Sequence, residues 1–238
     1  MKKIFFILIS FCLSLTMAAQ TLEEQIANAE SGDAEAQFNL GYNYFHGAND
    51  VPQDYAQAVR WYQAAAEQNH PKAICNLGFC YDGGSGVEKD EVKAVELYRK
   101  AAELGDIVAQ FNLGYDYYHG EGVEMDYEQA VFWYRKASDK GYAEAQCNLG
   151  YCYELGNGVP QDDILAAYWY RKAAEQGHAI SQCNLGHFYL EGKGVTKSLK
   201  EARIWWGYAA AQGYESAAQA LRSHPIKKAS PTRKVKRH

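Results

Sequence analysis

Residues 143–178 read AEAQCNLGYCYELGNGVPQDDILAAYWYRKAAEQGH, and this stretch decides the fold because the chain contains five related copies of it. The triplet Asn-Leu-Gly places a glycine at positions 41, 78, 114, 150 and 186, at steps of 37, 36, 36 and 36 residues. An alanine later in each copy keeps the same register, at 65, 101, 137, 173 and 209. A fixed period of this length is typical of stacked structural repeats.

Each copy predicts two helices. In the first copy we expect a helix over 34–46 that ends at Gly47, because glycine accepts the left-handed backbone that closes a helix. A second helix should follow Asp54, whose side chain can accept the unpaired amides of the first turn. The equivalent helix-ending glycines are Gly84, Gly120, Gly156 and Gly192, and the equivalent N-caps are Asp90, Asp126, Asp162 and Ser198. One such helix pair cannot bury enough apolar surface alone, so neighbouring pairs must stack.

These motifs resemble the Sel1-like repeat family, which is related to the tetratricopeptide repeats. The resemblance covers residues 34–214 and includes Ala-x-x-x-Leu-Gly, Gly-x-Gly-Val and Trp-Tyr-x-x-Ala-Ala in register. It implies an all-α fold, a right-handed α/α superhelical solenoid of about five two-helix repeats of 36 residues. It also implies a scaffold or adaptor that binds a protein or peptide partner.

The repeat register gives the domain boundaries. We expect repeats at 34–70, 71–106, 107–142, 143–178 and 179–214. Residues 20–33 resemble a second helix with its turn and predict an N-terminal capping helix, whereas 215–221 begin a further helix that predicts a C-terminal cap. The solenoid would then span 34–221.

The first 19 residues have the pattern of an export signal. Lys2 and Lys3 precede an apolar run over 4–15, and small residues follow for cleavage after Ala18 or Ala19. The run is too short for an ordinary transmembrane helix, so we expect no membrane span after signal removal; a retained N-terminal anchor is the alternative. The sequence therefore predicts an exported bacterial protein, periplasmic or secreted.

Charge is distributed unevenly along the chain, whose formal net charge is −5. Residues 222–238 contain seven basic residues and no acidic one, and we expect this basic tail to be disordered. The tail could touch anionic surfaces or an acidic partner, fold back on the acidic repeat body, or merely aid solubility. The acidity of the repeat body excludes nucleic acid as its expected partner, because phosphate binding needs a basic face.

A candidate binding groove follows from the helical wheel of the first helix, at about 100° per residue. Leu40, Gly41 and Tyr44 mark the side that packs on the second helix, so Asn39 and Tyr42 should face the opposite side. In the tetratricopeptide superhelix that side lines the concave groove. The predicted groove residues are Asn39, Asn76, Asn112, Asn148, Asn184, Tyr42, Phe79, Tyr115, Tyr151 and His187.

Two interpretations of these asparagines and aromatic residues remain open. Amides could pair with the backbone of an extended peptide while the rings cover its side chains. Alternatively, the asparagines could bond to the neighbouring repeat and hold the stack in register.

The sequence offers no catalytic residue, metal site or cofactor motif. Among cysteine-rich secreted members of the resembled family, some are credited with binding or weakly hydrolysing β-lactams, and this is the alternative function. In those members a pair of cysteines links each repeat to the next. The helix-ending positions of this chain have other residues instead: Ala66, Ala102, Ser138, Ala174 and Ala210. A second alternative is a secreted factor that binds host proteins through the same groove.

Five cysteines follow the signal segment: Cys75, Cys80, Cys147, Cys152 and Cys183. Partners five residues apart on one helix, such as Cys75 and Cys80, cannot bridge. The sequence leaves two possibilities, small apolar packing residues or bridges between neighbouring repeats such as Cys152 with Cys183.

Overall fold

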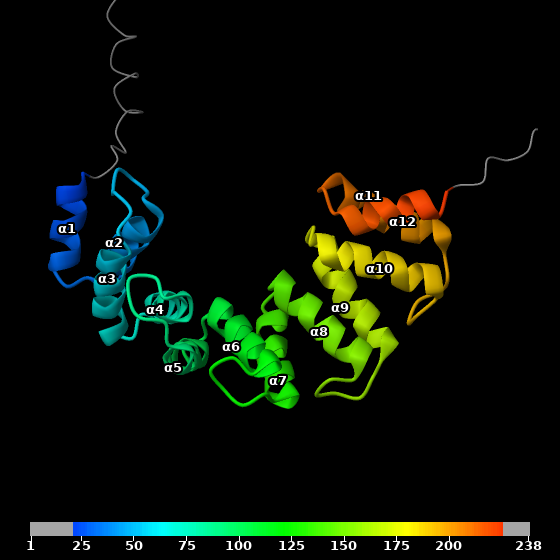
Figure 1. Ribbon diagram of the computed structural model, residues 1–238, viewed down its shortest axis with the longest axis horizontal. Coiled ribbons are helices and arrows are strands. Elements are labelled where there is room, and N and C mark those ends of the chain that lie inside the picture. Colours follow the sequence, from blue (N-terminus) through cyan, green and yellow to red (C-terminus); the bar gives the residue numbers. More distant parts are fainter. Residues whose placement is uncertain (1–20, 226–238) are drawn as a thin grey trace, which may run out of the picture. The chain divides into compact units, whose positions relative to one another are not determined.

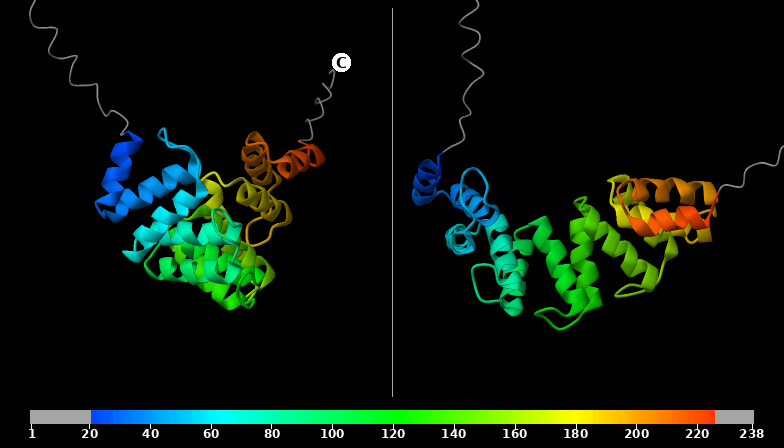
Figure 2. Two further views of the ribbon diagram at one scale, coloured as in Figure 1. Left: turned by 60° about the vertical axis from the view of Figure 1, so that its left-hand side comes forward. Right: turned by 45° about the horizontal axis from the view of Figure 1, so that its top comes forward.

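The computed structural model describes residues 21–225, which form twelve helices and no strand within that range. The predicted signal segment and most of the basic tail lie outside the described residues. Contacts divide the chain into two compact units, Met1–Met125 and Asp126–His238. In each unit, consecutive helices pack against one another as an all-α helical repeat solenoid, which confirms the predicted fold class (Figures 1 and 2).

The first unit contains six helices: α1 (Leu22–Glu30), α2 (Ala34–His46), α3 (Tyr55–Glu67), α4 (Pro71–Gly83), α5 (Glu91–Glu103) and α6 (Ile107–His119). The second unit contains the other six: α7 (Tyr127–Asp139), α8 (Ala143–Leu155), α9 (Asp163–Glu175), α10 (Ala179–Glu191), α11 (Leu199–Ala211) and α12 (Glu215–Ser223). The even-numbered helices from α2 to α10 are the first helices of the repeats, and the odd-numbered helices from α3 to α11 are the second.

The helix ends follow the predicted chemistry. The glycines that end the first helices are all left-handed, with φ from 64° at Gly47 to 83° at Gly192. Each predicted N-cap of a second helix accepts the amide three residues later, at 2.9–3.2 Å. α1 has a full capping box, in which Thr21 and Glu24 each accept the other's backbone amide. These caps satisfy groups that the short helices would otherwise leave unpaired.

The C-terminal cap extends past its predicted end. α12 continues to Ser223, so Arg222, which was expected to open the basic tail, is helical instead. The Arg203 Nη1 donates to the carbonyl of Leu221 at 3.0 Å, and the Arg222 guanidinium pairs with Glu215 at 2.6 Å. A side chain from α11 therefore satisfies a carbonyl in the last turn of α12.

The glycine of the Asn-Leu-Gly triplet lets the two helices of a repeat approach closely. A Cβ at Gly78 would lie 2.9 Å from Cε1 of Tyr98, and one at Gly150 would lie 2.9 Å from Cδ1 of Tyr170. Both tyrosines are fully buried. A methyl group at either glycine would overlap the ring, so the helix pair depends on the absence of a side chain there.

Glutamines link four of the five first helices to the helix that precedes them. Gln146 Nε2 donates to the carbonyl of Ser138 at 3.1 Å, and Gln176 Nε2 donates to Gln146 Oε1 at 2.8 Å. The same donation from a first helix to a preceding carbonyl recurs at Gln37, Gln110 and Gln182. The second repeat has Ile74 at this position, where a buried apolar side chain replaces the hydrogen bond. These glutamines, which were not predicted from the sequence, satisfy buried carbonyls near the C-terminus of the preceding helix.

All five described cysteines are buried free thiols. The bridge between Cys152 and Cys183 that the sequence left open is not formed, so these cysteines act as small packing residues. Burial raises the pKa of the Cys80 and Cys152 thiols to about 12.

We expect Gly78→Ala to lower the free energy of unfolding by about 1–3 kcal/mol, because the added methyl group overpacks against Tyr98. Gly207→Ala is the matched control, since a Cβ at this helical glycine meets nothing within 4 Å. It should raise stability by about 0.5–1 kcal/mol through helix propensity. Urea unfolding measures both changes, and equal effects of the two substitutions would contradict the close approach.

Gln146→Ala should cost about 1–3 kcal/mol, because it removes the buried donor to the Ser138 carbonyl and the closer of the two acceptors of Gln176. Gln176→Ala removes an exposed side chain from the same chain of hydrogen bonds and should cost less. Chemical denaturation of the two variants gives the order, and a larger loss at Gln176 would refute the central role of the buried glutamine.

Candidate functional site

The ten predicted groove residues lie on the first helices of the repeats. Asn39 is exposed, whereas the four other asparagines are half-buried. The ring positions are exposed, with exposed fractions from 38% at Tyr115 to 51% at Phe79 among the tyrosines and the phenylalanine. The first unit carries Asn39, Asn76, Asn112, Tyr42, Phe79 and Tyr115, and the second carries Asn148, Asn184, Tyr151 and His187.

The asparagines also interact with the packed core. Burial raises the pKa of Tyr98, and the side chain of Asn112 opposes this rise through its interaction with the tyrosine hydroxyl. Burial also raises the pKa of Tyr170, and the side chain of Asn184 opposes that rise. The Tyr170 hydroxyl donates to Glu154 at 2.7 Å. These contacts support the interpretation that the asparagines serve the stack, and they leave the exposed rings as the more available part of the surface.

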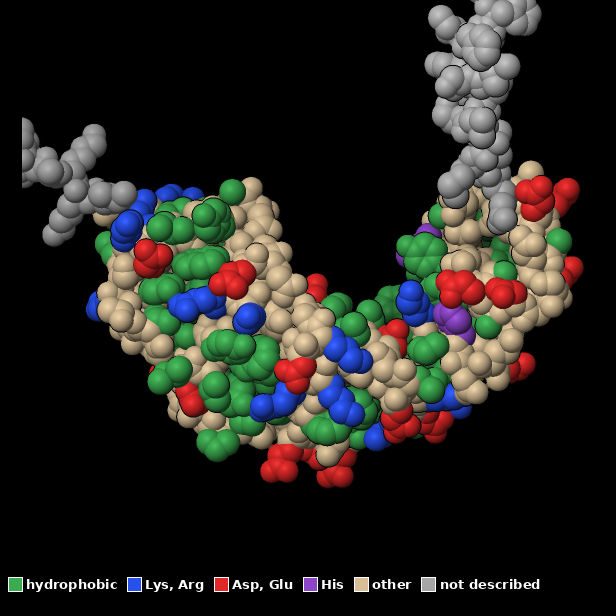
Figure 3. Space-filling model, turned by 180° about the vertical axis from the view of Figure 1, so that it is seen from behind, with side chains coloured by type: hydrophobic (Ala, Val, Ile, Leu, Met, Phe, Trp, Pro, Cys, Tyr) green, Lys and Arg blue, Asp and Glu red, His purple; other side chains and the backbone are tan. Residues whose placement is uncertain are grey.

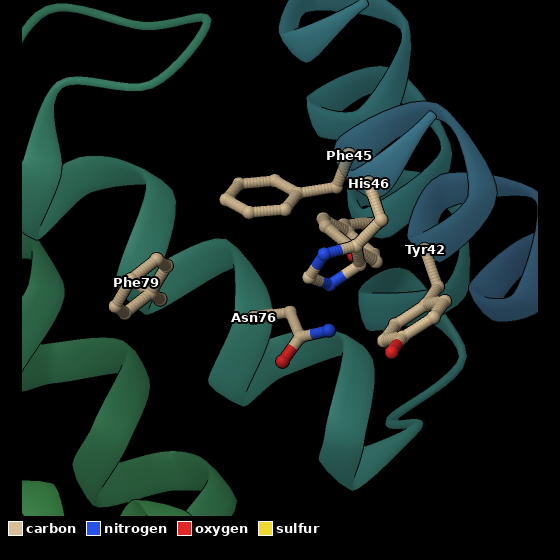
Figure 4. A pocket seen from close by; sticks show the side chains of 6 residues that line it. Tyr42, Phe45, His46, Asn76 and Phe79 are labelled. Carbon is tan, nitrogen blue, oxygen red and sulfur yellow. The ribbon is translucent and has the colours of Figure 1, made fainter. Parts of the chain in front are cut away.

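An aromatic pocket of about 190 Å³ lies on the first unit, between α2 and α4 (Figure 4). Its lining residues are Tyr42, Phe45, His46, Tyr62, Asn76 and Phe79. The Phe45 and Phe79 rings stand edge to face, with centroids 5.9 Å apart. The pocket is therefore a ring-lined recess with one amide, which suits an apolar side chain more than a charged one.

A second pocket of about 230 Å³, the acid pocket, shares Phe79 with the aromatic pocket. It is lined by Phe79, Asp82, Tyr98, Phe111, Asn112, Tyr115, Asp116 and Glu121. Phe79, Asn112 and Tyr115 were predicted from the sequence as site residues, whereas the three carboxylates were not. For Asp116 the signal was an acidic residue two positions after its repeat's glycine, where the other copies have the uncharged residues Asn43, Cys80, Cys152 and Phe188.

Asp116 is the unusual member of the acid pocket. Its side chain is 6% exposed, and its Oδ2 atom has no hydrogen-bond partner. Burial, with smaller contributions from the negative charges of Asp82, Glu121 and Glu91, raises the pKa of Asp116 to about 8. A nearby cation, Lys89, is paired with Glu91 at 2.7 Å. Asp116 therefore lacks the partner that a buried carboxyl group normally has.

The raised pKa of Asp116 predicts a pH-dependent stability. The folded protein keeps this carboxyl group protonated up to about pH 8, whereas the unfolded chain ionises it near its ordinary pKa of 3.8. The folded state binds more protons between these values, so the stability contribution of Asp116 falls as the pH rises through this window. Asp116→Asn should therefore gain stability relative to the unsubstituted protein between pH 5 and pH 8. Urea unfolding across this range measures the gain, and a pH-independent difference would contradict the buried neutral carboxyl.

Within residues 21–225, no three carboxylate, imidazole or thiol side chains are grouped so that they could hold a metal ion. Over the same range, no helix has the length and apolar character needed to cross a bilayer. Exposed apolar side chains lie among acidic and basic ones on the face shown in Figure 3.

The repeats match a known family along most of the chain. The model of the Sel1 repeat matches residues 34–70, 71–106, 107–142, 143–178 and 179–214. The chain belongs to the Sel1-repeat family. Sel1-repeat proteins are generally non-catalytic scaffolds for protein–protein interactions, and the resemblance inferred from the motifs is confirmed.

Solved structures support this membership. A Sel1-repeat protein from Oxalobacter formigenes is 33% identical with a TM-score of 0.76, and the match covers 85% of this chain and 89% of that one. A protective antigen of uropathogenic Escherichia coli strains with an SLR fold is 36% identical with a TM-score of 0.71, over 85% of this chain and 51% of the antigen. The chain thus spans about half the length of the antigen.

A curated relative matches over a shorter stretch. The secretory immunoglobulin A-binding protein EsiB of Escherichia coli O6:H1 (strain CFT073) is 48% identical over 44 residues, which are 18% of this chain and 9% of EsiB. This length is little more than one repeat, so the similarity reflects the repeat itself.

Proposed function

We propose that this protein is a non-catalytic scaffold of the bacterial cell envelope that binds an extended polypeptide along the first helices of its repeats. The observation that carries the proposal is the pair of neighbouring pockets on the first unit, which share the exposed ring of Phe79. Rings that stand exposed beside recesses offer a large apolar contact area at little conformational cost. Exposed tyrosines also occur on the second unit, at Tyr151 for example.

Export to the periplasm or beyond is part of the proposal, and it rests on the signal-like pattern of residues 1–19. A secreted factor that binds host proteins would use the same surface and differ only in its destination. EsiB is named as a secretory immunoglobulin A-binding protein, so secretory immunoglobulin A is one partner to test.

The β-lactam alternative has weaker physical support. Hydrolysis through a covalent intermediate needs an activated nucleophile, and burial raises the pKa of the described cysteines, so their thiolates are suppressed. A chromogenic β-lactam assay tests this alternative directly.

The binding proposal is tested by a photocrosslinking amino acid placed in living cells at Tyr115 or Tyr151, with mass spectrometry of the captured species. A matched control is Lys100, an exposed position on α5 outside both pockets. We expect one discrete polypeptide from Tyr115 and Tyr151 but not from Lys100. Equal capture from all three positions, or capture from none, would overturn the proposal.

A further inference from the structure

The acid pocket differs from the aromatic pocket in its charge. The two recesses share Phe79 and each contains one asparagine of the predicted groove, but the acid pocket adds Asp82, Asp116 and Glu121. Asp82 and Glu121 are half-buried, so their charges are only partly screened by solvent. Lys89, a basic side chain that interacts with Asp82 and Glu121, is exposed and paired with Glu91.

Asp116 indicates what kind of ligand the acid pocket lacks. It lines the recess, is more than nine-tenths buried, and has an Oδ2 atom with no donor. A buried carboxyl oxygen without a donor costs free energy, and a ligand that supplies an N–H group recovers this cost. Asp82 and Glu121 line the same recess and are more exposed than Asp116, and their carboxylates favour a donor with a positive charge.

The rings of the acid pocket favour the same ligand. Phe79 and Tyr115 are exposed at 51% and 38%, and Phe111 is half-buried between solvent and core. Aromatic faces attract ammonium and guanidinium groups, and they also pack against the aliphatic stem of a lysine or arginine. A recess of about 230 Å³ has room for such a side chain.

We propose that the acid pocket receives the lysine or arginine side chain of an extended peptide, while the aromatic pocket beside it receives an apolar side chain of the same peptide. The inference rests on the proposed function and names the chemistry of its ligand. A peptide is favoured over a free cation because the pockets adjoin at Phe79, so that one chain can fill both.

The test uses a phage-displayed library of random linear peptides selected on the full chain and on two variants. Asp116→Asn keeps the shape of the side chain but cannot ionise, so it removes the negative charge that Asp116 would gain when a cation binds beside it. Asp139→Asn is the matched control, because Asp139 is an exposed aspartate at the end of α7. Glu121→Gln is a second pocket variant, and circular dichroism verifies that every variant is folded.

We expect the unsubstituted protein and Asp139→Asn to select peptides with a basic residue next to an apolar or aromatic one. Asp116→Asn and Glu121→Gln should select the apolar residue with a weaker basic preference. For one selected peptide, replacing its basic residue by norleucine should weaken binding about tenfold to a hundredfold in the unsubstituted protein and clearly less in Asp116→Asn, as a double-mutant cycle measured by calorimetry.

The outcomes separate this inference from the proposed function. Peptides selected without any basic preference would overturn the cation pocket and leave the peptide-binding face intact. A basic preference that persists unchanged in both pocket variants would place the cation elsewhere and overturn the inference as well. If no peptide is selected by the folded protein, both the proposed function and the inference fail.

Discussion

The contact between a glycine and an aromatic ring governs how each repeat is built. At Gly78 and Gly150 the first helix lies so close to the second that a methyl group would overlap Tyr98 or Tyr170. The glycine backbone packs directly against the ring, and this contact sets the distance between the two helices because no flexible side chain lies between them. Gly186 meets Trp206 in the same way, so a larger ring is accommodated at the same position. A buried first-helix position two residues after this glycine nevertheless differs between the copies.

The variable positions are where specificity can arise. Two residues after the triplet glycine, the copies have Asn43, Cys80, Asp116, Cys152 and Phe188, all of them buried. Asn43 has side-chain partners, bonding to Gln25 at 2.7 Å and to Asn49 at 2.9 Å. By contrast, the Oδ2 atom of Asp116 has no hydrogen-bond partner, and Asp116 lines the acid pocket. A single buried substitution in a constant scaffold thus changes the chemistry of the pocket without changing the helices around it.

Much of the fold could be predicted from the sequence, because its determinants are local and repeated. Helix ends at Gly47 and N-caps such as Asp54 depend on residues within one turn, and five copies reinforce each inference. The glutamine hydrogen bonds were missed because their partners are eight residues before and about 30 residues after, in helices that meet only through stacking. The acid pocket was missed for a related reason: Asp82, Asp116 and Glu121 come from two repeats, and no helical wheel of one repeat brings them together. Of these three residues, Asp116 could have been singled out from the sequence, because it is the charged residue at a position where the other copies have uncharged ones.

The buried cysteines have a consequence for how the chain reaches its folded state. Folding hides five thiols that every unfolded molecule exposes, and none of them has a native bridge to form. In an oxidising compartment, collapse of the helix pairs therefore competes with thiol oxidation, and any disulfide made early is a non-native crosslink. Repeat arrays depend mainly on contacts between near neighbours, which form quickly. Rapid local stacking would shorten the time for which the thiols are exposed to oxidation in such a compartment.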